Sequence, residues 1–343
     1  MIHIPDTIEI NDDIRSLTSV VCHSLSDVPD IIDTWNEGKV VDVEGYYENA
    51  KINRVYVDRV HVKKAFAEYT AAYNADDPKI KLKIDHTYRV AALCERIAKA
   101  AGMCAYDVEL AWLSGMLHDV GRFEQIKRYN TFSDADSVDH AKFGADLLFK
   151  DGLISTFLKG MVKCTGYKPG ALEDRYDSDG VFLYDRLNKS DMEMLELAIR
   201  CHNMYRIPQG LNRREQAFCN VLRDADKVDI FKVNIDTPLE EIYNTTTEEL
   251  MKSDITDEVL KAFDEEHCIL KAIRRTPADT VIGHVSLAYE LVYDESVRIT
   301  VEQGYLAKLM HFHSDNEETN RKMAMVREKM DSYVKKRIGE KDA

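Results

Sequence analysis

The sequence predicts an all-α fold, and three observations support this prediction. Turn-forming residues are scarce, because the 343 residues include only 7 Pro and 15 Gly. Hydrophobic residues make up 45% of the chain and charged residues 31%, a balance typical of globular proteins rather than of disordered chains. After residue 60, apolar residues recur at the three- and four-residue spacing of amphipathic helices.

Helices are expected where this spacing runs between residues that start or end a helix. The Asp-Pro pair at Pro78 ends the first helix, and Gly102 and Gly121 end the second and third. Ser137 caps the fourth helix, and Ser190–Glu193 form a capping box for the fifth. A long loop or small lid is expected over residues 166–190. The expected helices span residues 60–75, 84–101, 107–120, 137–150, 190–202 and 213–233, with three or four more over 257–337.

The composition also limits the function. Asp and Glu total 61 against 46 for Lys and Arg, and the net charge of −15 excludes broad binding to nucleic-acid phosphates. No apolar run approaches the roughly 18 residues that span a membrane, and the N-terminus lacks an export signal. A cytoplasmic protein without membrane contact is therefore expected. Its seven dispersed cysteines contain no CxxC pair, which predicts reduced thiols.

Charge and patterning divide the chain into three parts. Residues 1–58 are expected to form an acidic, irregular appendage, because the first 50 contain 11 Asp and Glu against only Arg15 and Lys39. Residues 59–240 form the core, and residues 241–343 add C-terminal helices that pack on it. The last helix carries an apolar stripe that indicates either helix packing or a homodimer seam. This stripe consists of Met323, Val326, Met330 and Val334.

Several core helices carry His or Asp on a face that is otherwise apolar. His86, for example, shares a stripe with Val90 and Ile97, so its imidazole is expected to point inward. One inward histidine is most simply a core residue with a hydrogen bond, but a buried carboxylate needs a cation or several donors. Together, imidazoles and carboxylates indicate divalent metal, and two ions bridged by a carboxylate would use six ligands. The six candidates are His86, His118, Asp119, His140, His202 and Asp226.

Three segments resemble the signatures of the HD-domain metal-dependent phosphohydrolase superfamily. They are Asp85–Val90 (DHTYRV), Met116–Arg122 (MLHDVGR) and Arg223–Asp229 (RDADKVD). The resemblance spans about residues 86–229 and implies an all-α bundle, with residues 59–240 as the metallohydrolase core. It assigns four ligands of a first metal, namely His86, His118, Asp119 and Asp226.

The same resemblance extends to a second metal. His140 and His202 are similar to the additional histidines of the branch of the family that holds two metals. The ligand Asp226 is chosen because it directly precedes Lys227, as in the family pattern, and Asp224 is the alternative. One or two divalent ions per chain are implied, and the ligand types suit Mn, Fe, Co, Ni, Zn or Mg.

The implied activity is hydrolysis of a phosphoester, in a nucleotide or other small phosphorylated metabolite, by water that the metal makes acidic. Beside the ligand Asp119, Arg122 and Lys227 are the candidate catalytic residues, because positive side chains must hold the remaining phosphate oxygens. Lys127 and Arg206 are further candidates for substrate binding. Asp139 either orients the ring of His140 or caps the helix that begins there.

Two other classes of function agree with the same residues. The first is a two-iron oxygenase of the HD type, which iron-dependent consumption of O₂ would reveal. The second is a regulatory protein that binds a nucleotide without turnover, with residues 1–50 transmitting the bound state. Loss of turnover in a folded His118→Ala variant would exclude this second class.

Overall fold

The computed structural model describes residues 57–74, 76–158, 189–243 and 245–339. Every regular element in these residues is a helix, which confirms the predicted all-α fold. Residues 1–56 of the expected acidic appendage and residues 166–188 of the expected loop lie outside the described residues. Among the described helices, none has both the length and the hydropathy needed to cross a lipid bilayer.

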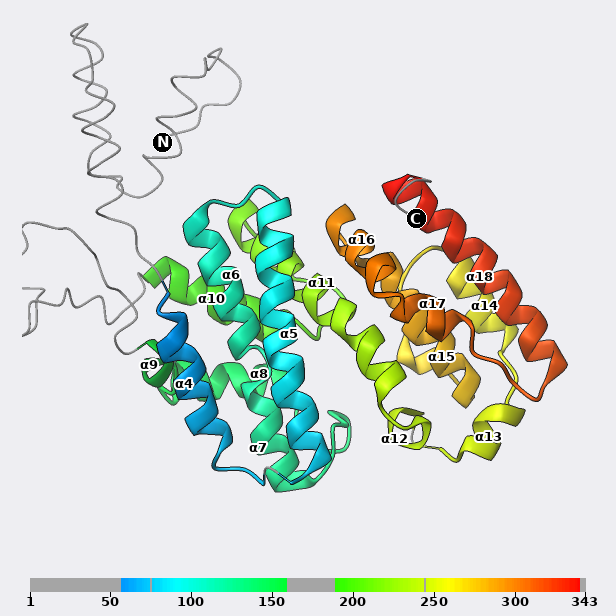
Figure 1. The fold of residues 1–343 in the computed structure, drawn as a ribbon, viewed down its shortest axis with the longest axis horizontal. Coiled ribbons are helices and arrows are strands. Elements are labelled where there is room, and N and C mark those ends of the chain that lie inside the picture. Colours follow the sequence, from blue (N-terminus) through cyan, green and yellow to red (C-terminus); the bar gives the residue numbers. More distant parts are fainter. Residues whose placement is uncertain (1–56, 75, 159–188, 244, 340–343) are drawn as a thin grey trace, which may run out of the picture.

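The core is a bundle whose centre is formed by α5, α6 and α11, with α7, α8 and α10 packed around them (Figure 1). The helix α11 extends from this bundle toward the C-terminal helices and joins the two parts. The core elements are α4 (Arg59–Thr70), α5 (Pro78–Ala100), α6 (Ala105–Leu117), α7 (Val120–Tyr129), α8 (His140–Ala145), a π-helical turn (Asp146–Lys150), α9 (Ile154–Leu158), α10 (Lys189–Cys201) and α11 (Arg213–Asp236).

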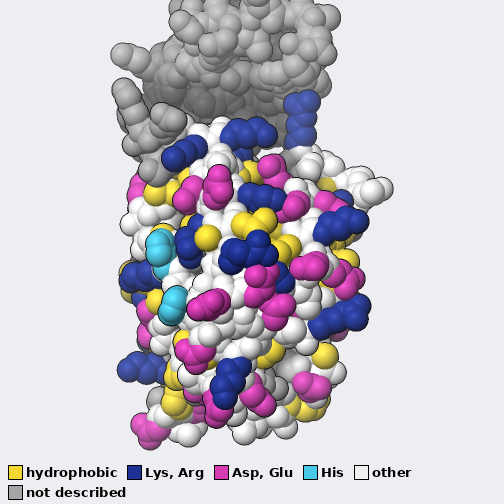
Figure 2. All heavy atoms as spheres, turned by 90° about the vertical axis from the view of Figure 1, so that its right-hand side faces the viewer, with side chains coloured by type: hydrophobic (Ala, Val, Ile, Leu, Met, Phe, Trp, Pro, Cys, Tyr) yellow, Lys and Arg dark blue, Asp and Glu magenta, His cyan; other side chains and the backbone are white. Residues whose placement is uncertain are grey.

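From residue 257 on, the described residues form five α-helices, where three or four were expected. The apolar stripe of α18 is buried, and α18 packs on α14 and α16, so this chain's own helices cover the stripe. On the outer face of these helices, side chains of both charges are mixed (Figure 2). The elements are α12 (Leu239–Tyr243), α13 (Thr247–Lys252), α14 (Asp257–Asp264), α15 (Pro277–Val285), α16 (Asp294–Gln303), α17 (Tyr305–Met310) and α18 (Glu317–Ile338), with 3₁₀ turns at Lys271–Ile273 and Ser286–Glu290.

Two of the predicted helix boundaries were wrong because capping residues were misread. The Asp-Pro pair begins α5 instead of ending α4: Asp77 accepts a hydrogen bond from the Lys79 N–H, and Pro78 occupies the first helical position. The N-cap of α8 is Asp139, not Ser137, because the Asp139 carboxylate accepts the Lys142 N–H.

A third boundary, at Ser190, was also wrong: this residue lies inside α10, which already includes Lys189. A fourth error concerns Gly121, which lies inside α7 and does not end α6. A Cβ at Gly121 would lie 2.4 Å from the carbonyl oxygen of His140 and 2.7 Å from the nitrogen of Gly144. This glycine therefore lets α7 approach α8 and fixes the position at which His140 enters the core.

One buried carboxylate connects α11 to the C-terminal helices. Asp224 is fully buried and accepts hydrogen bonds from the N–H groups of Val292 and Tyr293 and from the Ser296 hydroxyl. The helices α16 and α17 also pack along α11. These contacts place the segments between residues 268 and 290 opposite the core.

Candidate metal centre

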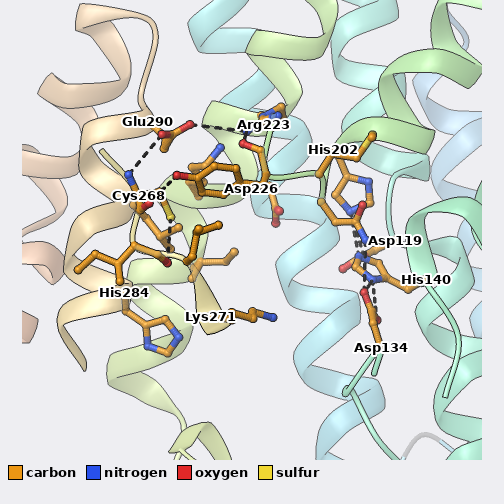
Figure 3. Close-up of a pocket in the computed structure, with 18 of the residues that line it drawn as sticks. Asp119, Asp134, His140, His202, Arg223, Asp226, Cys268, Lys271, His284 and Glu290 are labelled. Atoms are coloured by element: carbon orange, nitrogen blue, oxygen red, sulfur yellow. Dashed lines mark hydrogen bonds and ion pairs between the residues drawn. The ribbon is translucent and has the colours of Figure 1, made fainter. Parts of the chain in front are cut away.

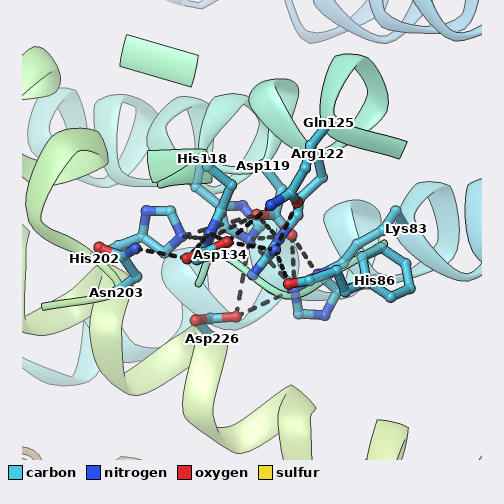
Figure 4. Close-up of polar contacts among 12 residues, drawn as sticks. Lys83, His86, His118, Asp119, Arg122, Gln125, Asp134, His202, Asn203 and Asp226 are labelled. Atoms are coloured by element: carbon cyan, nitrogen blue, oxygen red, sulfur yellow. Dashed lines mark hydrogen bonds and ion pairs between the residues drawn. The ribbon is translucent and has the colours of Figure 1, made fainter. Parts of the chain in front are cut away.

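The bundle brings all six predicted ligands together, although they come from separate elements. His86 lies on α5 and Asp226 on α11, whereas His118 and Asp119 form the turn between α6 and α7. The other two are the first residue of α8, His140, and His202 in the turn after α10. Figure 4 shows five of them meeting inside the core.

The six side chains form two clusters that share Asp119. Candidate ligand atoms of His86, His118 and Asp119 lie within 4.8 Å of one another, and those of Asp119, His140 and His202 do so as well. The carboxylate of Asp226 joins the first cluster, with Oδ1 at 3.2 Å from His86 Nε2 and 3.9 Å from His118 Nε2. The alternative ligand, Asp224, faces the C-terminal helices instead.

Hydrogen bonds fix which nitrogen of each histidine faces inward. The Nδ1 atoms of His118 and His202 lie 2.7 Å from the carbonyl oxygens of Gly115 and Ile199. Those of His86 and His140 lie 2.6 and 2.7 Å from the carboxylates of Asp229 and Asp134. Because these oxygens only accept, each Nδ1 carries the hydrogen, and in the neutral ring Nε2 presents a lone pair.

The inward nitrogens form close pairs without a donor between them. Nε2 of His86 is 3.3 Å from that of His118, and Nε2 of His140 is 3.1 Å from that of His202. Asp119 Oδ1 is also buried without a hydrogen-bond partner. Facing lone pairs and an unsatisfied buried carboxylate oxygen are unfavourable unless a proton or a cation lies among them. This set of donors fits divalent cations.

Burial and neighbouring charges set the protonation of the clusters. Burial lowers the pKa of His118 below its ordinary value, and it lowers the pKa of His140 and of His202 to about 4. These three rings are therefore neutral near pH 7, the form that binds metal. Burial also disfavours the charged form of His86, but Asp226 and Asp229 more than offset it and raise the pKa of this ring.

The shared carboxylate is ionised. Burial alone would raise the pKa of Asp119, but the positive charges of Lys83 and Arg122 hold it well below its usual value. Lys83 Nζ lies 2.6 Å from Asp119 Oδ2 and was not among the residues that the sequence singled out. It lies three residues before His86 on α5, and this spacing on the inward face is the signal that could have identified it.

The residue that orients His140 also differs from the one considered from sequence. Asp134, in the loop between α7 and α8, accepts the hydrogen bond from His140 Nδ1 and forms an ion pair with Arg122 at 2.9 Å. Asp139 instead caps α8 and accepts from the Asn203 amide at 2.9 Å. No helical periodicity points to a loop residue, so only the structure identifies Asp134.

Asp134→Ala is expected to weaken metal binding about 10- to 100-fold, because His140 loses the acceptor that fixes its tautomer. Asp139→Ala is the matched control, and it should cost only about 1 kcal/mol of stability through the lost cap. Titration of the metal-free protein with Mn²⁺ or Zn²⁺, followed by calorimetry, measures the difference. Equal affinities in the two variants would contradict this role for Asp134.

The clusters open into a cavity of about 570 Å³ between the core and the C-terminal helices (Figure 3). Asp119, His140 and His202 lie on one side, and the opposite wall comes from residues 268–272, 274, 284, 287 and 290. Six cationic side chains line this cavity, namely Lys83, Arg122, Arg223, Lys227, Lys271 and Arg274.

The predicted substrate-binding residues divide into two groups. Arg122 and Lys227 line the cavity, but Arg122 Nη1 is committed to the Phe132 carbonyl and to Asp134. The structure does not bring Lys127 or Arg206 into the cavity. Lys127 is exposed on the outer face of α7, two residues beyond the buried Gln125, and Arg206 is exposed with its guanidinium over the Tyr205 ring.

Comparison with protein families gives a match to the HD domain over residues 84–267, more than half of the chain. This range contains all six residues of the two clusters. Searches of curated proteins and of solved structures give no match. The match confirms the resemblance that the three sequence segments indicate. The chain belongs to the HD domain family, most of whose members are metal-dependent phosphohydrolases.

Proposed function

We propose that this protein hydrolyses a phosphoester of a small phosphorylated metabolite, with nucleotides as the first class to test. The observation that carries the proposal is the pair of buried clusters that share Asp119 and open into a cavity lined by six cations. This concentration of positive side chains is unusual in a chain with a net charge of −15, and it suits a phosphorylated ligand.

The proposed metal ligands are His86, His118, Asp119 and Asp226 at one position and Asp119, His140 and His202 at the other. A divalent cation held there would lower the pKa of a water molecule toward neutrality and offset negative charge on the phosphoryl group.

Side chains around the clusters orient the proposed metal ligands and offer a contact to the phosphate group. Asp229 and Asp134 keep the rings of His86 and His140 oriented, through the Nδ1 contacts at 2.6 and 2.7 Å. Lys227 lines the cavity and has no side-chain partner among the described residues, so it is available to donate to a phosphate oxygen. Arg122 acts indirectly, because it holds the loop that carries Asp134.

Phosphate release with matched histidine variants tests the proposal. The full chain would be purified without added metal, analysed for its elements, stripped with a chelator and reloaded with Mn²⁺, Fe²⁺, Co²⁺, Ni²⁺, Zn²⁺ or Mg²⁺. We expect metal-dependent phosphate release from at least one member of a panel of mono-, di- and cyclic nucleotides and sugar phosphates. His118→Ala should abolish release, whereas His313→Ala, which removes an exposed histidine outside the cavity, should not.

Three outcomes would overturn the proposal. Iron-dependent consumption of O₂ without phosphate release would favour the two-iron oxygenase. Nucleotide binding with no turnover under any metal would favour the regulatory protein. Unchanged phosphate release in His118→Ala would show that the clusters are not the site of the reaction.

A further inference from the structure

The end of the cavity next to the C-terminal helices carries four cationic side chains, three of which form no ion pair with any described residue. This basic end consists of Arg223 and Lys227 on α11 and Lys271 and Arg274 in the segment before α15. The one carboxylate of the cavity lining at this end is Glu290, with Oε2 at 3.8 Å from Arg223 Nη2. In Figure 3, Lys271 extends from the C-terminal side toward the space between the two walls.

The cations at the metal-ligand end are paired, in contrast to those at the basic end. Lys83 contacts Asp119 at 2.6 Å, and Arg122 contacts Asp134 at 2.9 Å. Among the described residues, neither Lys227 nor Lys271 has a side-chain hydrogen bond or ion pair, although Lys227 is only 9% exposed. The cations without an ion pair therefore lie at the basic end of the cavity and come from both of its walls.

The two arginines of the basic end have donors without acceptors. Arg223 is 7% exposed, and its Nη2 donates to the Tyr205 carbonyl at 3.2 Å, while its Nη1 is buried without a partner. Arg274 Nη2 donates to the Ile269 carbonyl at 2.5 Å, while its Nε is buried without a partner. Because buried cations and unsatisfied donors are costly, an anion bound here would offset a real energetic penalty.

The basic end is also built to hold these side chains in place. A Cβ at Gly283 of α15 would lie 2.2 Å from Arg274 Cζ, so the absence of a side chain there makes room for the guanidinium. The Tyr205 hydroxyl donates to the Cys268 carbonyl at 2.9 Å and joins the two walls. Donors fixed before binding lose little conformational entropy when they meet an anion.

We propose that the basic end binds a second phosphate group of the substrate, so that the substrate is a small molecule with two separate phosphates. This inference rests on the proposed function, which places the phosphoester to be cleaved at the metal clusters. The cavity of about 570 Å³ lies in the usual range for small-molecule sites. Ile230, Ile269 and Leu287 also line the cavity and provide apolar contacts for the organic part of the substrate.

The first test measures binding without turnover. The full chain, stripped of metal by a chelator, would be titrated with inorganic phosphate and followed by calorimetry and by thermal unfolding. We expect one phosphate per chain, and we expect Lys271→Glu to weaken binding at least about tenfold, because a bound anion loses a donor and meets a like charge. Lys261→Glu makes the same charge change at an exposed site outside the cavity and should bind as the parent does. Because Lys271 is exposed, its substitution should not disturb folding. The thermal unfolding curve of the variant checks that weaker phosphate binding does not come from misfolding.

The second test measures the preference for two phosphates. With the metal-loaded chain, kcat/KM would be compared for adenosine 3′,5′-bisphosphate and adenosine 5′-monophosphate. We expect the bisphosphate to be preferred about tenfold or more, and Lys271→Gln to remove most of this preference while Lys261→Gln keeps it.

The two tests separate this inference from the proposed function. If phosphate binding depends on Lys271 but the protein releases no phosphate from any substrate, the basic end is an anion site and the proposed hydrolase activity is wrong. The inference is overturned if metal-free protein binds no phosphate, or if Lys271→Glu and Lys261→Glu bind it equally. It is also overturned if a hydrolase activity shows no preference for a second phosphate.

Discussion

Asp119→Asn is expected to abolish phosphoester hydrolysis and to lower the metal content of the chain while the helical bundle stays folded. Asp119 is the residue common to both ligand clusters, and its carboxylate is the counter-ion of Lys83 at 2.6 Å. A neutral amide of the same size cannot offset the charge of a divalent ion, and the loss should be on the order of 10²- to 10³-fold or more.

Elemental analysis, phosphate release and circular dichroism measure the three parts of this prediction. Asp107→Asn is the matched control, because Asp107 pairs with Arg214 at 2.7 Å outside the cavity. Full metal content and full turnover in Asp119→Asn would show that the shared carboxylate does not hold metal. Loss of helical structure would instead show a structural role for this residue.

Asp224→Ala is expected to lower the free energy of unfolding by about 3–5 kcal/mol. The substitution leaves two backbone N–H groups, of Val292 and Tyr293, and the Ser296 hydroxyl without their buried acceptor. Each orphaned buried donor costs roughly 1–3 kcal/mol, so the loss of the acceptor for three donors accounts for a decrease of this size.

Urea denaturation at fixed pH measures this loss, with Asp294→Ala as the control. Asp294 lies at the start of the same helix, α16, and forms a half-exposed ion pair with Arg337 at 2.9 Å, for which about 1 kcal/mol or less is expected. Folded Asp224→Ala should keep its metal, because Asp226 and not Asp224 faces the clusters. Loss of metal from the folded variant would reverse this assignment.

The sequence predicted the inward histidines because helical periodicity is a local property. His86 repeats with Val90 and Ile97 on one face of α5, and all three are buried. The same periodicity runs through the His-Asp doublet, so the turn that separates α6 from α7 at His118 was not expected. Gly121 was predicted to end a helix, but it lies where α7 and α8 approach each other closely. Such an approach depends on residues outside the helix, which local periodicity does not reveal.

The cavity could not be predicted in the same way, because its walls meet only through tertiary contacts. Asp134 lies six residues before His140, whose ring it contacts, and this spacing has no helical meaning. Lys271 and Arg274 belong to no motif, and their place opposite α11 follows from how the C-terminal helices pack. Nearness in the sequence can also mislead: Arg206 lies four residues after His202, yet only His202 lines the cavity.

The order of the two walls along the chain has a consequence for biosynthesis. A ribosome releases residues 86–226, and with them all six side chains of the clusters, before it makes the segment 268–290 that closes the other side. During translation, all the proposed metal ligands are therefore made before the residues of the opposite cavity wall. A nascent chain halted between these points would carry every proposed metal ligand but would lack Lys271 and Arg274.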